Sequence, residues 1–180
     1  MASTYLDAIL SSHRARAAAD DRDWRTRRVS ATGPSLEHSI REHRQRGNAV
    51  IAEIKRKSPS KGWLAEHLDV AAQAALYERA GASAISVLTD VPHFAGSVQD
   101  LQTARTASTL PTLRKDFTVS LNDVLDTAEM GASAVLLIVA ALSDEELREF
   151  SKVARDIGLD ALVEVHDEQI GRASCRERVS

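Results

Sequence analysis

The sequence has almost no cysteine and few aromatic residues. A single cysteine, Cys175, stands among 180 residues, which excludes an intramolecular disulfide framework and any zinc site built from several cysteines. Aromatic residues make up 4% of the chain, too few for the stacking platforms that bind single-stranded nucleic acids. The net charge is -3, and this slight acidity gives no reason to expect a nucleic acid or a membrane surface as partner.

Long apolar runs and targeting signals are also missing. The longest apolar run, residues 134–142, is far shorter than the ~20 residues of a membrane span. The N-terminal stretch MASTYLDAILSSHRAR has no basic segment before an apolar core, so we expect no secretory signal. With 43% hydrophobic and 27% charged residues, the composition is that of a globular domain able to bury one core. A cytoplasmic protein is the expectation.

Residues 3–46 contain two polar, arginine-rich helical patterns. In the first, aspartates and arginines alternate over LDAILSSHRARAAADDRDWRTRR, a mixture typical of a solvated helix face rather than a nucleic-acid arm. The second, SLEHSIREHRQRG, has Ser35 as its predicted N-cap, Glu37 in its first turn and Gly47 just past its end. These patterns predict an N-terminal helical extension over residues 1–47.

From residue 48 the pattern changes to repeated strand and helix units. YERAGASAISVLTD and AEMGASAVLLIVA are near-repeats, and RDIGLDALVEVH is a looser third copy. In each, a helix ends at a glycine (Gly81, Gly131 or Gly158) and an aliphatic run follows, as expected of a strand buried on both faces. Five strands are predicted near residues 49–55, 84–89, 111–115, 134–139 and 161–165, and four helices over 70–80, 97–107, 122–130 and 144–157.

The repeated units predict an α/β fold with a parallel sheet. No helix opens with a glycine-rich nucleotide fingerprint, and nothing in the sequence fits a P-loop. A doubly wound nucleotide-binding fold is therefore the weaker alternative. The stronger one is a (β/α) barrel, in which active sites lie at the C-terminal ends of the strands.

Ionisable residues occupy the ends of three predicted strands. Because side chains alternate along a strand, Glu53 and Lys55 share one face of the first. Lys115 ends the third strand, and Glu164 stands among the apolar residues of the fifth. Burial lowers the pKa of a lysine and raises that of a carboxylate, toward the range useful for proton transfer at neutral pH. The set suits acid–base chemistry on a small anionic molecule, and the alternative is a structural ion-pair network that closes the barrel mouth.

Further residues near the strand ends have two interpretations each. Phe94 and Phe117 are either core residues or contacts for a substrate ring. His93 and His166 are expected at the surface or in support of the site. The basic segment RKSPSKG, residues 56–62, is either an exposed turn or a lid that closes over an anionic substrate.

Four motifs together match one protein family. IAEIKRKSPSKG, SVLTD…FAGS, LRKDF and LVEVHDE, in this order and at these spacings, closely resemble indole-3-glycerol phosphate synthase of tryptophan biosynthesis. The likeness runs from the N-terminal helices to about Glu168. It implies a (β/α)8 TIM barrel with an extra N-terminal helical segment and a lyase reaction without cofactor or metal. That reaction converts 1-(2-carboxyphenylamino)-1-deoxyribulose 5-phosphate, a small anionic phosphorylated substrate, into indole-3-glycerol phosphate, carbon dioxide and water.

The resemblance also implies a role for each site residue. Lys115 would be the general acid that protonates the ribulose carbonyl oxygen, and Glu164 the base or proton relay. Lys55 would bind anionic substrate groups, and Glu53 would orient the lysines. The implied substrate-binding residues are Ser58 in a flexible lid and Phe94, Phe117 and Leu136 around the anthranilate ring.

The sequence departs from the family pattern at its C-terminal end. A full barrel takes about 250 residues and eight strands, whereas residues 48–169 predict about five βα units, an incomplete barrel. The family's later motifs, including its phosphate-binding loop, have no counterpart here. Residues 170–180, IGRASCRERVS, resemble the translated read-through of a sequencing adapter, and we interpret them as a non-native tail. We expect the chain alone to be inactive and to associate through the exposed edges of an open sheet.

Two alternative functions stay open. One is a Schiff-base aldolase, another barrel lyase with a lysine at a strand end, although the paired Glu53 and Lys55 and the RKSPS loop argue against it. The other is a non-catalytic barrel fragment, whose charges are structural or which docks a partner enzyme of the same pathway.

Overall fold

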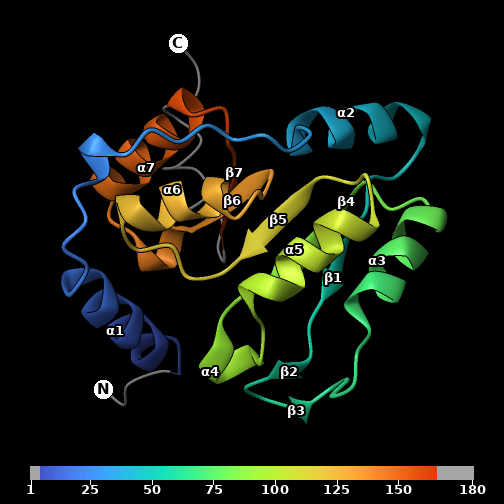
Figure 1. Cartoon of the computed structure of the whole chain (residues 1–180), viewed down its shortest axis with the longest axis horizontal. Coiled ribbons are helices and arrows are strands. Elements are labelled where there is room, and N and C mark those ends of the chain that lie inside the picture. Colours follow the sequence, from blue (N-terminus) through green and yellow to red (C-terminus); the bar gives the residue numbers. More distant parts are fainter. Residues whose placement is uncertain (1–4, 166–180) are drawn as a thin grey trace.

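A parallel sheet of five strands forms the centre of the molecule (Figure 1). The computed structural model describes residues 5–165. Every neighbouring pair of strands in the sheet is parallel, and the predicted strands are confirmed with their ends shifted by at most two residues. In spatial order the strands are β1 (Ile51–Ile54), β4 (Ala84–Leu88), β5 (Thr112–Lys115), β6 (Ala134–Ile138) and β7 (Asp160–Glu164).

Helices connect these strands as the repeats predict. The four connecting helices are α3 (Val70–Arg79), α5 (Val98–Ala107), α6 (Leu121–Glu129) and α7 (Asp144–Asp156). Shorter elements that the sequence patterns did not predict are the hairpin of β2 (Lys57–Ser58) and β3 (Gly62–Trp63), α4 (Val91–Phe94), and the 3-10 turns Trp24–Thr26 and Val139–Ala141. Along residues 5–165, no helix combines the length and the apolar character that a membrane crossing requires.

Glycine turns three of these helices into the strands that follow. Gly81, Gly131 and Gly158 have φ angles of 82°, 86° and 75°, the left-handed conformation that residues with a Cβ adopt only with strain. At Gly131 a Cβ would in addition lie 2.7 Å from the guanidinium of Arg105, a flexible side chain that would have to move aside. The predicted role of these glycines is confirmed.

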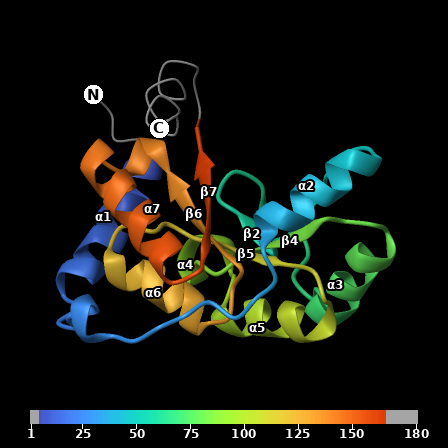
Figure 2. The same ribbon diagram turned by 90° about the horizontal axis from the view of Figure 1, so that it is seen from above.

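The four connecting helices cover one face of the sheet (Figure 2). On that face Ile54, Ile85 and Val87 pack with α3 and α5 in one apolar cluster, and Val135 and Leu137 pack with α6 and α7 in another. Because successive side chains of a strand point to opposite faces, Ile51 lies in a third cluster, on the opposite face. By the same alternation, Glu53 shares the face of Ile51, away from the helices, whereas Ile54 faces them.

A helix of the N-terminal extension covers the third apolar cluster. Leu36 and Ile40 of α2 (Leu36–Arg46) pack against Leu113 and Leu136 of the sheet. The Ser39 hydroxyl donates a 2.7 Å hydrogen bond to the Ser83 carbonyl just before β4. Helix α2 therefore lies at the N-terminal ends of the strands, and it begins at Ser35, the predicted N-cap.

The part of the extension that precedes α2 contains α1 (Tyr5–Ala18), which lies near the C-terminal ends of β4 and β5 (Figure 1). Between α1 and α2 the chain runs along α6 and α7. Four of its arginines have distant carboxylate partners, which corrects the prediction of a merely solvated helix face. The ion pairs are Arg14 with Glu146, Arg16 with Asp123, Arg22 with Asp126, and Arg27 with Asp126 and Glu129. Arginine forks bind carboxylates in a fixed geometry, so these pairs fasten the extension to the two helices.

Two predictions fall beyond the described residues. The interpretation of residues 170–180 as a non-native tail and the placement of His166 both lie outside residues 5–165.

Candidate active site

Lys115 and Glu164 meet at the C-terminal ends of β5 and β7. The Lys115 ammonium donates a 2.6 Å hydrogen bond to Glu164 Oε2, with 29% and 28% of the two side chains exposed. Strand β6 lies between β5 and β7, so the two side chains reach each other across one strand. The structure thus brings together two of the ionisable residues that the sequence places at strand ends, and both side chains stay partly exposed to solvent.

Glu53 and Lys55 form a second pair on β1 and just after it. The Lys55 ammonium lies 2.5 Å from Glu53 Oε1, and about a third of each side chain is exposed. The Tyr77 hydroxyl donates a 2.9 Å hydrogen bond to the Glu53 carbonyl and fixes the end of β1 to α3. Strand β1 is an edge strand two places from β5, so the two pairs stand on different parts of the same rim.

Aromatic and aliphatic side chains lie beside the Lys115–Glu164 pair. Phe117 packs on the apolar cluster that contains Leu136, which is 1% exposed. The rings of Phe94 and Phe117 are 6.3 Å apart and inclined by 37°, within the range in which offset aromatic rings attract each other. The structure therefore brings three of the four predicted substrate-binding residues together in one wall.

The fourth, Ser58, lies in the basic segment after β1. Its buried hydroxyl accepts a 3.2 Å hydrogen bond from the Lys61 amide and closes the turn between β2 and β3. Arg56, in the same segment, donates to both oxygens of Asp100 on α5 and to the Leu68 carbonyl. Arg56 thus fastens the base of the segment to a helix, and the interpretation of the segment as a lid stays a prediction.

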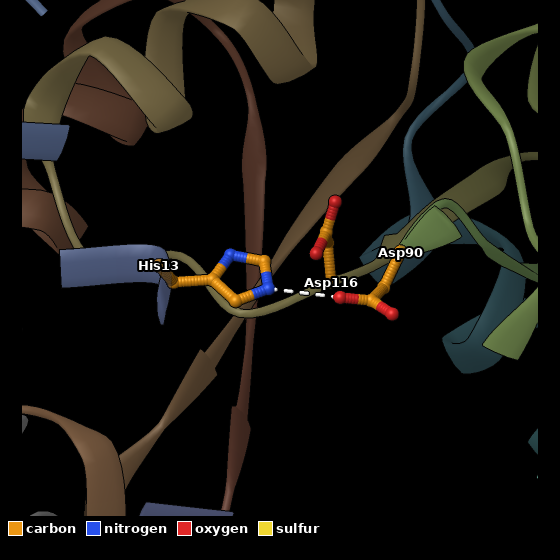
Figure 3. A group of neighbouring side chains, drawn as sticks. All are labelled: His13, Asp90 and Asp116. Atoms are coloured by element: carbon orange, nitrogen blue, oxygen red, sulfur yellow. Dashed lines mark hydrogen bonds and ion pairs between the residues drawn. The ribbon is translucent and has the colours of Figure 1, made fainter. Parts of the chain in front are cut away.

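A buried group that the sequence interpretation missed joins α1 to the ends of β4 and β5. His13 from α1, Asp90 after β4 and Asp116 after β5 lie side by side (Figure 3), and each is at most 6% exposed. The His13 Nε2–H donates a 2.9 Å hydrogen bond to Asp90 Oδ2. The only local signals were that Asp90 and Asp116 stand within the motifs SVLTD and LRKDF, and nothing marked His13.

These three residues offer one potential metal ligand each, with the ligand atoms within 4.8 Å of one another. Protein donors already engage the carboxylates, however. Asp116 accepts from the Arg114 guanidinium, the Thr89 hydroxyl and the Phe117 amide, while Asp90 accepts from His13 and the His93 amide. The group is therefore a hydrogen-bonded network rather than a set of free ligands.

Hydrogen bonds decide the charge state of Asp90 within this network. Burial by itself raises the pKa of this carboxyl group, but the hydrogen bonds from His13 and from the amide and ring of His93 outweigh it and lower the pKa from 3.8 to about 2. Asp90 is therefore a carboxylate at neutral pH. Asp90 also caps α4, since its Oδ1 accepts a 2.8 Å hydrogen bond from the His93 amide. His93 therefore contacts a residue of the buried group, in line with the predicted supporting role.

Most of the sequence, residues 6–174, matches the family model described as indole-3-glycerol phosphate synthase. The chain belongs to this family. Curated relatives of that name include one from Desulfosudis oleivorans, 48% identical over 85% of this chain and 56% of the relative, and one from Koribacter versatilis, 43% identical over 96% of this chain and 68% of the relative. A third, from a Nocardioides species, is 54% identical over 69% of this chain and 48% of its own length.

Membership of the indole-3-glycerol phosphate synthase family accounts for the fold. The family is a TIM barrel, and a parallel sheet of five strands with helices on one face is the arrangement of an incomplete barrel. The chain spans about half to two thirds of the length of the curated relatives it matches. Lys115 and Glu164 stand at the rim where barrels of this kind carry their chemistry.

Proposed function

We propose that this chain carries the acid–base groups of an indole-3-glycerol phosphate synthase. In the proposed reaction, 1-(2-carboxyphenylamino)-1-deoxyribulose 5-phosphate loses carbon dioxide and water to form indole-3-glycerol phosphate. The observation that carries the proposal is the 2.6 Å contact between Lys115 and Glu164 at the strand ends. The family of the chain and the shared name of its relatives support the choice of substrate.

Lys115 is the proposed general acid. It donates a proton to the ribulose carbonyl oxygen as the aromatic carbon that bears the carboxylate attacks the carbonyl carbon and the ring closes. Loss of carbon dioxide returns the electrons of the broken carbon–carbon bond to the benzene ring and restores its aromaticity. The new hydroxyl then leaves as water with a proton from Lys55, and Glu164 takes the proton of the adjacent ring carbon, which forms the double bond of the indole. Glu164, hydrogen-bonded to Lys115, is positioned to return a proton to it.

Lys55 and Glu53 have supporting roles in this proposal. Lys55 binds the anionic groups of the substrate and serves as a second acid when water leaves, while Glu53 orients it through their direct contact. The wall formed by Phe94, Phe117 and Leu136 receives the anthranilate ring. Ser58 belongs to the segment that covers the site.

The exposure of the two lysine–glutamate pairs favours a catalytic over a structural interpretation. Ion pairs with about a third of each side chain in solvent contribute roughly 0–1 kcal/mol to stability. Pairs that contribute so little are not what holds the fold together. Removing Lys115 is therefore expected to affect the reaction far more than the fold.

The test is the formation of indole-3-glycerol phosphate by the full-length product of the gene that encodes this chain, assayed beside the 180-residue chain. Lys115→Met should lower kcat about 100- to 10,000-fold, the usual contribution of a general acid. Lys152→Met is the matched control, because Lys152 is exposed on α7, where it pairs with Asp156 four residues away. Absence of product from the full-length protein, or a kcat of Lys115→Met equal to that of the control, would contradict the proposal.

The same proteins discriminate the alternatives. Borohydride reduction in the presence of substrate that leaves a covalent adduct on Lys115 would favour a Schiff-base aldolase. A full-length protein that turns over neither kind of substrate would favour a non-catalytic barrel. A cytoplasmic location, activity without cofactor or metal, and association through the edge strands β1 and β7 stay predictions, the last open to light scattering at several protein concentrations.

A further inference from the structure

Helix α1 brings one ring to the aromatic wall of the site. The ring centroid of His13 lies 5.2 Å from that of Phe117, and the two rings are inclined by 52°. Phe117 in turn contacts Phe94, the last residue of α4. A row of three rings therefore runs from the N-terminal extension, through the end of β5, to the segment after β4.

Hydrogen bonds hold the first ring of this row in place. His13 is 6% exposed, and its Nε2–H donates to an Asp90 carboxylate whose side chain is 1% exposed. The same carboxylate accepts the His93 amide at the start of α4. Turning the His13 ring would take one hydrogen-bond donor away from a buried carboxylate, which is unfavourable. One carboxylate thus couples α1 to the short helix that carries Phe94.

Phe117 is held through its backbone, while its ring depends on its neighbours. The Phe117 amide donates a 2.8 Å hydrogen bond to Asp116, which the buried Arg114 guanidinium fixes at 2.9 Å. The ring itself is only half-buried, and its position depends on packing against His13 and Phe94. Packing partners of this kind restrict the orientation of a ring without touching the reacting groups.

We propose that His13 is a positioning residue that α1 contributes to the substrate-binding wall. Its imidazole holds the rings of Phe117 and Phe94 in the offset arrangement against which an aromatic substrate ring binds. The identity of that ring rests on the proposed function, whereas the positioning of Phe117 does not. Loss of the His13 ring should therefore weaken substrate binding and leave the proton transfers at Lys115 unchanged.

The chain offers a direct readout, because it contains three phenylalanines. The 180-residue chain is labelled with 4-fluorophenylalanine, and each 19F resonance is assigned by replacing one phenylalanine with tyrosine. His13→Gln keeps an N–H donor for Asp90 and removes the ring. His38→Gln, at an exposed site on α2, is the matched control. Phe150, a buried residue of α7 in the apolar cluster with α6, reports on the fold in a different cluster from that of Phe117.

We expect His13→Gln to move the Phe117 resonance and to leave that of Phe150 where it is, while His38→Gln moves neither. In the full-length gene product, His13→Gln should raise KM about threefold to tenfold, the equivalent of one aromatic contact, with kcat within about twofold. An unmoved Phe117 resonance, a shift of Phe150 as large as that of Phe117, or a fall in kcat at unchanged KM would each overturn the positioning role. A full-length protein that forms no indole-3-glycerol phosphate refutes the proposed function instead, and the 19F comparison still decides the role of His13.

Discussion

Asp116 forms a buried ion pair with Arg114. Replacing the Asp116 carboxylate allows a quantitative test of the structure. Its carboxylate lies 2.9 Å from the Arg114 guanidinium, and the two side chains are 4% and 6% exposed. Breaking one partner of such a pair costs about 3–5 kcal/mol, because the other charge stays buried. Arg114 keeps hydrogen bonds to Thr127 and to the Asp123 carbonyl, so we expect Asp116→Asn to cost about 3 kcal/mol, at the lower end.

The measurement is urea denaturation of the 180-residue chain followed by far-UV circular dichroism, with the midpoint and the slope fitted for each variant. Asp156→Asn is the control, since Asp156 pairs with Lys152 at 2.7 Å but is 55% exposed, and its loss should cost less than about 0.5 kcal/mol. The double variant Arg114→Met/Asp116→Asn should cost at least about 1 kcal/mol less than the sum of the single variants. Equal costs for Asp116→Asn and Asp156→Asn, or strict additivity, would refute the interpretation of a buried, coupled pair.

Three further predictions concern the framework of the site. Asp90 has a folded pKa of about 2 against 3.8 in the unfolded chain, so its contribution, about 2 kcal/mol, should be present above pH 4 and lost as the pH falls toward 2. Urea midpoints between pH 5 and pH 2.5 should show this loss, and Asp90→Asn should lack it. Gly96→Ala would place a Cβ 2.2 Å from the Leu88 carbonyl oxygen, so its thermal midpoint should fall by an amount equivalent to about 3 kcal/mol, and an unchanged midpoint would contradict that contact. Ser143→Ala removes the N-cap of α7 and should cost about 1 kcal/mol in the same urea assay, whereas a neutral result would show that the cap contributes nothing.

The sheet could be predicted from the sequence because its signals are local. Each glycine after a helix and each aliphatic run after the glycine lies within a dozen residues, and together they give the order and direction of the strands. The meeting of Lys115 with Glu164 follows from the same rule, since the C-terminal ends of parallel strands share one rim. Both inferences need periodicity and no knowledge of distant contacts.

The missed features depend on contacts between distant parts of the chain. His13 and Asp90 are 77 residues apart, and a lone histidine on a polar helix has no pattern that announces a buried partner. The arginines of the extension stand next to aspartates in the sequence and so resemble a self-compensating solvated surface. In the fold, Arg16 instead pairs with Asp123, which is 107 residues away. Local charge balance does not predict the partner that tertiary packing selects.

The arginine pairs of the extension have a consequence for the order of assembly during synthesis. Helix α1 leaves the ribosome well before α7, because Glu146, the partner of Arg14, follows 132 residues later. At about 5–20 residues per second, α1 waits roughly 7 to 26 s for that partner. An isolated helix of 14 residues is marginal in water, so α1 is made long before all of its stabilising partners are present. Until α7 has been synthesised, the nascent protein can use the partners of α1 at Asp90 and Asp123 but lacks the ion pair between Arg14 and Glu146.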